Sequence, residues 1–301
     1  MATTKLATLV SPDAALRRLW TGGEWCEGPV WIAGEAAVLW SDIPNDRVLR
    51  WTERDGPSVF LHPAGFQNGH TLDLDGSVLA CSHGERRIER LHLDGGREPL
   101  VDRYRGMRLN SPNDLVVKRD GTIWFTDPPY GILSDREGHK AESEIGACLV
   151  FRFDPRTGDL DAVTDTMVHP NGLAFSLDES ILYVSDTDGW GTPGGPHHIL
   201  AFDIIDGRRL GPPRLYYDVP AGVPDGFRLD EHGNVFTSTL EGIHVVAPDG
   251  ALIGRIPVPE RTSNCVFGGP DGRTLFITAG ASLYAIETLV RGAVPGPGGH
   301  R

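Results

Sequence analysis

Six short motifs along the chain each open with a side chain that carries a carboxylate or carboxamide oxygen, and in four of them glycine follows. Such oxygens suit a hard divalent cation when they face a common centre, and two carboxylates would balance its charge. A single Asn-Gly or Asp-Gly dipeptide is an ordinary turn, but six polar residues in matching positions favour a metal site. The opening residues are Glu27, Asn68, Asn113, Asn171, Asp225 and Asn264.

Other common catalytic signatures do not occur in the sequence. It contains no Gly-x-Ser-x-Gly elbow, no His-Glu-x-x-His pair and no glycine-rich phosphate loop. The run 73–76 begins like a calcium-binding loop, but the rest of that pattern does not follow, so it is better interpreted as a hairpin turn. A bound metal would therefore have to carry any chemistry.

The spacing of the six motifs indicates that each belongs to one copy of a repeated unit. Their opening residues are about 39 to 58 positions apart, and a second matched pair ends 14 or 15 positions after each of them. A period near 40 residues built from short strands is typical of a β-propeller, whose constant blade cores alternate with unequal loops. The second pairs are Ser41-Asp42, Ser82-His83, Thr126-Asp127, Ser185-Asp186, Ser238-Thr239 and Thr278-Ala279.

Apolar runs separated by glycine turns predict that these units are built from strands. Runs such as 123–126 and 181–184 have strand composition, and Asp-Gly pairs between such runs supply hairpin turns. We predict an all-β fold: one six-bladed β-propeller with four-stranded blades over residues 1–290, then a flexible tail over 291–301. The last unit has room for three strands only. An N-terminal strand around residues 16–20 is expected to complete it and cover its edge.

Four of the second pairs contain an ionisable side chain further along the strands. We expect the six opening residues to form a ring around the central channel, because equivalent positions of the blades face its axis. The side chains of the second pairs could support this ring or hold a second ion, but residues of this kind often form hydrogen bonds between blades. We interpret them as structural, and we interpret His83 as a hydrogen-bonded wall of the channel rather than a base. The four residues are Asp42, His83, Asp127 and Asp186.

Composition narrows the classes of partner. The chain has 301 residues and a formal net charge of -13, which argues against nucleic acid or an anionic membrane as a partner. No apolar segment is long enough for a signal peptide or a membrane span, so we predict a cytoplasmic protein.

The four cysteines lack metal-binding spacing and are expected to be free, although Cys26 and Cys265 each lie beside a ring position.

Five runs of sequence resemble the SMP-30/gluconolactonase family over about residues 20 to 290, and their combination is specific. The run 124–131, with Phe-Thr-Asp-Pro-Pro-Tyr-Gly, resembles bacterial and fungal gluconolactonases more than the animal regucalcin branch. The five runs are 27–31, 109–114, 124–131, 169–176 and 224–226.

The resemblance implies a set of site residues. Three metal ligands of the family transfer to Glu27, Asn171 and Asp225, and a fourth, known from related lactonases, transfers to Asn113. The run Arg108-Leu109-Asn110 matches the Arg-x-Asn pattern of a sugar-contacting motif in the regucalcin branch, although the residues that follow depart from the animal pattern. The expected cofactor is one divalent ion, Ca²⁺ first, with Mg²⁺, Mn²⁺ or Zn²⁺ as alternatives.

The expected activity is hydrolysis of a small sugar lactone such as gluconolactone. The metal would polarise the carbonyl and Asp225 would act as general base toward water. Asn68, Arg108, Asn110 and Asn113 are the expected substrate-binding residues.

Three other functions remain open on the sequence alone. They are a phosphotriesterase like diisopropyl-fluorophosphatase, a tailoring enzyme acting on a non-sugar ester or hemiacetal, and a calcium-binding propeller without turnover. The loops 132–145 and 188–197 are expected to cover one mouth of the channel and to set specificity. The particular lactone, the native ion and the oligomeric state have no readable signal in the sequence.

Overall fold

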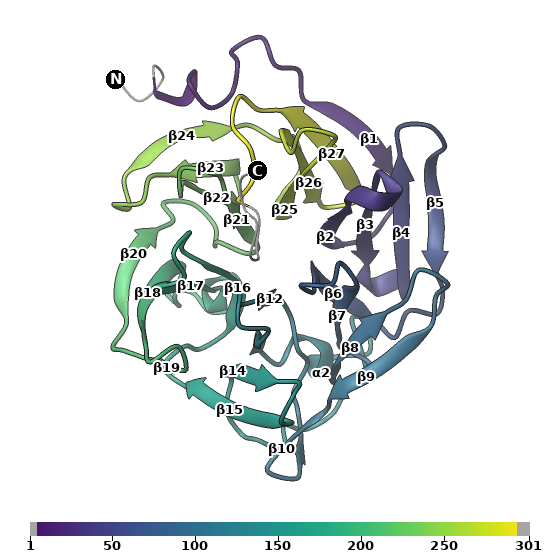
Figure 1. The fold of residues 1–301 in the computed structure, drawn as a ribbon, viewed down its shortest axis with the longest axis vertical. Helices are drawn as coiled ribbons and strands as arrows, with labels where there is room; N and C mark the ends of the chain where they lie inside the picture. The colour runs from purple at the N-terminus through teal and green to yellow at the C-terminus, as the bar shows by residue number, and fades with distance from the viewer. Residues whose placement is uncertain (1–4, 294–301) are drawn as a thin grey trace.

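The computed structural model describes residues 5–293, and they form the predicted six-bladed β-propeller (Figure 1). Blade 1 contains β2 (Cys26–Ile32), β3 (Ala37–Asp42), β4 (Arg47–Thr52) and β5 (Gly56–Leu61). Blade 2 contains β6 (Gln67–Leu72), β7 (Val78–Ser82), β8 (Arg87–Leu91) and β9 (Arg97–Val101). Blade 3 contains β12 (Leu115–Val117), β13 (Ile123–Asp127), β14 (Leu149–Asp154) and β15 (Asp159–Thr164).

The second half of the ring repeats this plan. Blade 4 contains β16 (Pro170–Phe175), β17 (Ile181–Asp186), β18 (His198–Ile205) and β20 (Arg214–Asp218), with a short additional strand, β19 (Arg209–Leu210). Blade 5 contains β21 (Phe227–Leu229), β22 (Val235–Thr239), β23 (Gly242–Val246) and β24 (Leu252–Ile256). Blade 6 contains β25 (Thr262–Gly268), β26 (Thr274–Ala279), β27 (Ser282–Glu287) and β1 (Arg17–Thr21).

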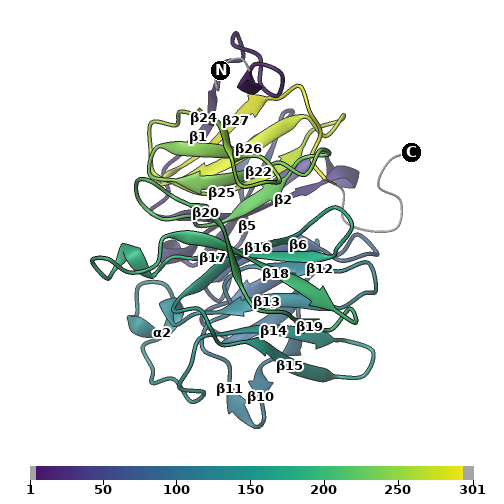
Figure 2. The same ribbon diagram turned by 90° about the vertical axis from the view of Figure 1, so that its left-hand side faces the viewer.

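The few remaining elements lie in connections between strands. The hairpin of β10 (Arg103–Tyr104) and β11 (Met107–Arg108) joins blades 2 and 3, and α2 (Tyr130–Leu133) follows β13. Figure 2, turned by 90°, shows α2 on one face of the disc. Among the described residues no helix is long and apolar enough to span a membrane. Three short 3-10 turns occupy Ala33–Glu35, Ile43–Asn45 and Asp188–Trp190.

The N-terminal strand closes the ring, as predicted. β1 pairs antiparallel with β27, with Arg17 opposite Ala285 and Thr21 opposite Ser282. Residues ahead of β1 also contribute to the core, because Leu9 and Val10 are buried in the cluster between blades 5 and 6. At the other end, Gly292 and Ala293 of the predicted flexible tail donate backbone hydrogen bonds to blades 6 and 5, and residues 294–301 lie outside the described residues.

Apolar side chains fill the spaces between neighbouring blades. Each of the six described clusters joins two adjacent sheets, for example the cluster of Trp124 and Phe175 between blades 3 and 4. A strand covered on both faces needs no polar alternation, and β3 is accordingly buried at every position. The described cysteines are all free, and Cys26 and Cys265 belong to different clusters.

Candidate metal-binding active site

The six ring residues predicted from the sequence lie at or just before the N-terminal ends of the innermost strands of the blades. These strands surround the axis in Figure 1. The second strands of the blades end at this same edge, and α2 follows one of them, so the ring lies toward the α2 face. We call this end of the channel the mouth. All six ring residues are less than a tenth exposed: Glu27, Asn68, Asn113, Asn171, Asp225 and Asn264.

The glycine that follows four ring residues is required by the close approach of the next blade. A Cβ at Gly69 would lie 2.5 Å from the backbone oxygen of Asn113, and its N–H donates a 2.9 Å hydrogen bond to that same oxygen. A Cβ at Gly28 would likewise overlap the backbone oxygen of Asn68. These glycines are therefore required because the next blade packs against them, and they are not simply turn residues.

Hydroxyl groups of the second matched pairs connect neighbouring blades at the level of the ring. Ser41 donates a 2.9 Å hydrogen bond to the backbone oxygen of Asn68, and Ser185 donates one of 2.8 Å to that of Asp225. Thr126 donates a 2.7 Å bond to the backbone oxygen of Asn171. These bonds hold the ring residues of one blade against the next.

The carboxylates of the second matched pairs accept hydrogen bonds from within their own blade. Asp127 accepts backbone hydrogen bonds of 2.8 and 2.9 Å from Asn110 and Ser111, just ahead of Asn113. Asp186 does the same, at 2.8 and 3.0 Å, for the two residues ahead of β16. Asp42 accepts from the backbone ahead of β2. The structural interpretation of these carboxylates agrees with this geometry, but they secure the loop of their own blade rather than a neighbour.

Burial and neighbouring charges disfavour the ionised forms of the two ring carboxyls, Glu27 and Asp225. Burial raises the pKa of Glu27 well above its ordinary value, and the charges of Asp225 and Asp114 raise it further. Burial likewise raises the pKa of Asp225 to about 7, with Asp114 adding to the effect and Arg261 opposing it. A divalent cation between Glu27 and Asp225 would favour the charged form of both.

Two buried oxygen atoms in the ring have no hydrogen-bond donor among the described residues: Oε1 of Glu27 and Oδ1 of Asn68. The other carboxylate oxygen of Glu27 accepts from the Gly28 N–H and, at 3.1 Å, from Nδ2 of Asn264. An unpaired buried acceptor is costly, and a hard cation satisfies such an oxygen directly. The donor set therefore fits a divalent metal.

Amide oxygens are an essential part of this donor set. In the part of the chain that the structure describes, no group of three His, Cys, Asp or Glu side chains could hold a metal ion. The two ring carboxylates, Glu27 and Asp225, would need the amide oxygens of neighbouring ring residues to complete a coordination sphere of six to eight oxygens.

The predicted sugar-contacting residues make contacts with the protein itself. Nη2 of Arg108 donates a 3.1 Å bond to the backbone oxygen of Glu85. Nδ2 of Asn110 donates to two backbone oxygens, and its Oδ1 accepts a 2.6 Å bond from Ser143. Their role toward a substrate stays a prediction, and both amide hydrogens of Asn110 are already used, which leaves its Oδ1 as the group that could accept from a substrate hydroxyl.

Two charged residues near the ring were not anticipated from the sequence. Arg261 lies three positions ahead of Asn264, and its guanidinium stacks over the Trp25 ring at 5.0 Å. Arg228 on β21 forms a 3.2 Å ion pair with Asp114 of blade 3. The register relative to the ring could have identified Arg261. The Arg228 pair joins residues 114 positions apart and has no local signal.

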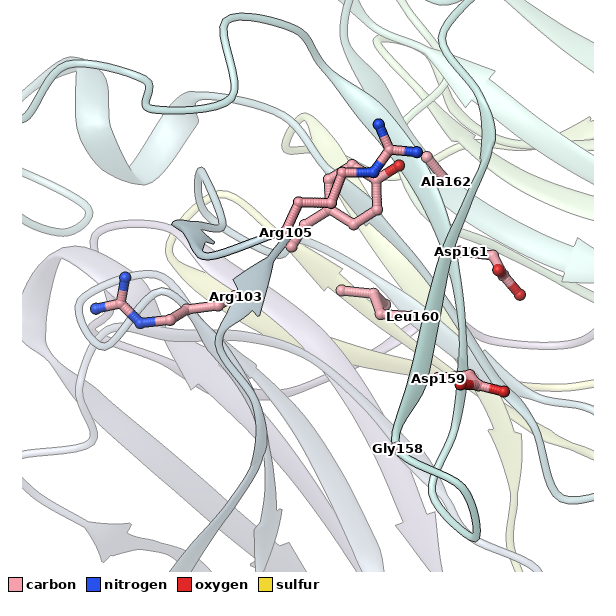
Figure 3. Close-up of a pocket in the computed structure, with 8 residues that line it drawn as sticks. Arg103, Arg105, Gly158, Asp159, Leu160, Asp161 and Ala162 are labelled. Atoms are coloured by element: carbon pink, nitrogen blue, oxygen red, sulfur yellow. The ribbon is translucent and has the colours of Figure 1, made fainter.

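The segment 134–148 between α2 and β14 covers part of the mouth. Arg136 forms a 3.0 Å ion pair with Glu24 of blade 1, and the backbone oxygen of Glu137 lies 3.0 Å from Nδ1 of His83 in blade 2. We call residues 134–148 the insert. A separate hollow of about 380 Å³ lies between the β10–β11 hairpin and β15, and none of its lining residues belongs to the ring (Figure 3).

Comparisons with known proteins agree with this architecture. The family model for the SMP-30/gluconolactonase/LRE-like region matches residues 25–281. A gluconolactonase of Zymomonas mobilis is 35% identical over 288 residues, covering 89% of this chain and 80% of the relative. A solved gluconolactonase from Xanthomonas campestris is 42% identical with a TM-score of 0.87, covering 94% of this chain and 92% of that one. A 6-deoxy-6-sulfogluconolactonase of Pseudomonas putida is 29% identical, covering 87% and 86%.

Proposed function

Because the chain belongs to the SMP-30/gluconolactonase/LRE-like family, we propose that it hydrolyses a small sugar lactone at a divalent metal ion in the mouth of the channel. Glu27, Asn113, Asn171 and Asp225 are the proposed ligands. The observation that carries the metal is the unpartnered, buried Oε1 of Glu27 beside a second carboxylate. The named activities of the relatives carry the choice of a lactone.

When bound, the cation would supply Lewis-acid polarisation of the lactone carbonyl. Asp225 is the proposed general base because a carboxylate that shares the metal is held close to the reacting atoms and can accept a proton from water. Its backbone is held on both sides: its N–H donates a 3.0 Å bond to Ser238, and its carbonyl accepts from Ser185. A base held in this way keeps its position while a water is activated.

The proposed substrate contacts lie on the blade 2 and blade 3 side of the mouth. Asn113 is buried in the ring, while Arg108 and Asn110 lie just ahead of it and are bonded to the insert through Glu144 and Ser143. Asn68 is the remaining predicted contact. Specificity for one lactone over another would then depend on the insert and on the loop at 188–197.

The decisive experiment measures acid release from gluconolactone and other aldonolactones by chelator-treated protein, with Ca²⁺, Mg²⁺, Mn²⁺ and Zn²⁺ added back singly. We expect at least one ion, Ca²⁺ first, to restore hydrolysis well above the spontaneous rate. Paraoxon in the same assay tests the phosphotriesterase alternative. Calcium binding without hydrolysis of any lactone or phosphotriester would favour a propeller without turnover and contradict the proposal.

A further inference from the structure

Asn68 and Asn264 occupy equivalent ring positions, but their amides have different surroundings. Both ends of the Asn264 amide are bonded: Nδ2 donates to Glu27 at 3.1 Å, and Oδ1 accepts from the Cys265 N–H at 2.8 Å. The Asn68 amide is bonded at one end only, where Nδ2 lies 3.3 Å from Nε2 of His83. Its Oδ1 is buried without a donor among residues 5–293.

The direction of the Asn68 amide follows from the hydrogen bonds of His83. The imidazole Nδ1 lies 3.0 Å from the backbone oxygen of Glu137, which can only accept, so Nδ1 carries the proton. In a neutral ring Nε2 is then an acceptor and requires a donor from Asn68. The amide must turn Nδ2 toward His83, and Oδ1 is therefore directed away from it.

Asn68 is the neighbour of the proposed metal ligand Glu27 in the ring. β6 packs beside β2, so closely that a Cβ at Gly28 would overlap the Asn68 backbone oxygen. The two unpartnered buried acceptors of the ring thus come from adjacent blades. One cation between them would satisfy both at once, and Ca²⁺ accepts six to eight oxygens.

We propose that Asn68 is a further oxygen ligand of the metal, and that His83, held by the Glu137 backbone oxygen of the insert, is the residue that positions it. This inference rests on the proposed metal site. It gives the insert a second role besides covering the mouth, because displacement of Glu137 would release His83 and allow the Asn68 amide to rotate. Asn68 would then contribute to metal affinity in the absence of substrate.

The test is a calorimetric titration of chelator-treated protein with Ca²⁺ in the absence of any lactone. Loss of an orienting partner typically weakens metal binding about 10- to 100-fold, so His83→Leu should raise the Kd for Ca²⁺ by about tenfold and Asn68→Ala by at least as much. His83→Gln, which keeps an acceptor and a donor, should recover part of the affinity. In the double variant the Kd should equal that of Asn68→Ala alone, because His83 acts through Asn68.

The matched control is Asn234→Ala, which removes a buried amide whose described side-chain bond goes to Asp230, away from the ring, and should leave the Kd unchanged. Circular dichroism checks folding, and Asn68→Ser replaces Asn68→Ala if the latter does not fold. An unchanged Kd in the Asn68 variant with reduced turnover would make Asn68 a substrate contact only. If the two substitutions weakened Ca²⁺ binding additively in the double variant, His83 would not act through Asn68. Wild-type protein that binds none of the four ions would overturn the proposed metal site itself.

Discussion

Among single residues, Asp225 carries the most specific chemical assignment. Asp225→Asn keeps one oxygen for the metal but cannot accept a proton, so we expect turnover of the best lactone to fall by about 10²- to 10⁴-fold. The steady-state rate measures this loss, and calcium titration shows whether the ion still binds. The control is Asn234→Ala, which should keep full turnover. An Asp225→Asn protein that binds the ion and retains its rate would contradict the role of general base.

His83 predicts a pH dependence of stability. Burial lowers its pKa to about 4 in the folded protein, against an ordinary value near 6.5. Between these values the unfolded chain binds a proton at His83 that the folded chain does not, so the contribution of His83 to stability rises with pH over this window and is lost as pH falls through it. The full effect is about 3 kcal/mol.

Urea unfolding of metal-free protein at several values between pH 4 and 7 measures a net slope, to which His83 and the ring carboxyls Glu27 and Asp225 contribute with opposite signs. The difference in slope between wild type and His83→Gln therefore gives the share of His83. Since His70 is also buried and its pKa is also lowered to about 4, a slope should remain in the variant. A variant with the full wild-type slope would show that His83 does not titrate as its burial implies.

The ring residues also show how far sequence reasoning extends. Six polar positions in register were enough to predict the ring, because the repeat places equivalent residues around one axis. The register could not distinguish Asn68 from Asn264, because the difference lies in Cys265 and His83, which bond their amides. Nor could it find the Arg228–Asp114 pair, since its two residues lie 114 positions apart in the sequence, on blades 3 and 5, which are not neighbours.

At the level of strands, the glycines after the ring residues should be sensitive to a single methyl group. Gly69→Ala would place a Cβ 2.5 Å from the Asn113 backbone oxygen, so blades 2 and 3 would have to separate. We expect a loss of about 1–3 kcal/mol in the free energy of unfolding. Gly34→Ala is the matched control, because a Cβ there meets nothing within 4 Å. Equal denaturation midpoints for the two variants would contradict the close approach of the blades.

The strand order was predictable because each blade repeats one local pattern, and the closing strand β1 begins within one residue of the expected position. The β10–β11 hairpin and β19 were not predicted, since each is only a two-residue pairing within a connection. The loop at 132–145 was expected over a mouth of the channel. The ion pair that joins it to blade 1 depends on Glu24, which is 112 positions away.

For the whole molecule, closure of the propeller by the N-terminal segment should decide whether the protein keeps its oligomeric state and unfolds cooperatively. Removing residues 1–21 deletes β1 and exposes the outer edge of β27, together with the apolar surface that Leu9 and Val10 cover. An open edge pairs readily with another chain, so we expect oligomers or aggregates in light scattering and a broadened unfolding transition.

Removing only residues 1–15 separates the two contributions of this segment. That protein keeps β1 paired with β27 but loses the buried Leu9 and Val10, which together should lower the free energy of unfolding by about 3–6 kcal/mol without opening the sheet edge. It should therefore keep the oligomeric state of the full-length chain but unfold at a lower denaturant concentration. If both truncated proteins scattered light as the full-length chain does, the edge of β27 would be protected by something other than β1, and closure by the N-terminal strand would not be what keeps the blades in one ring.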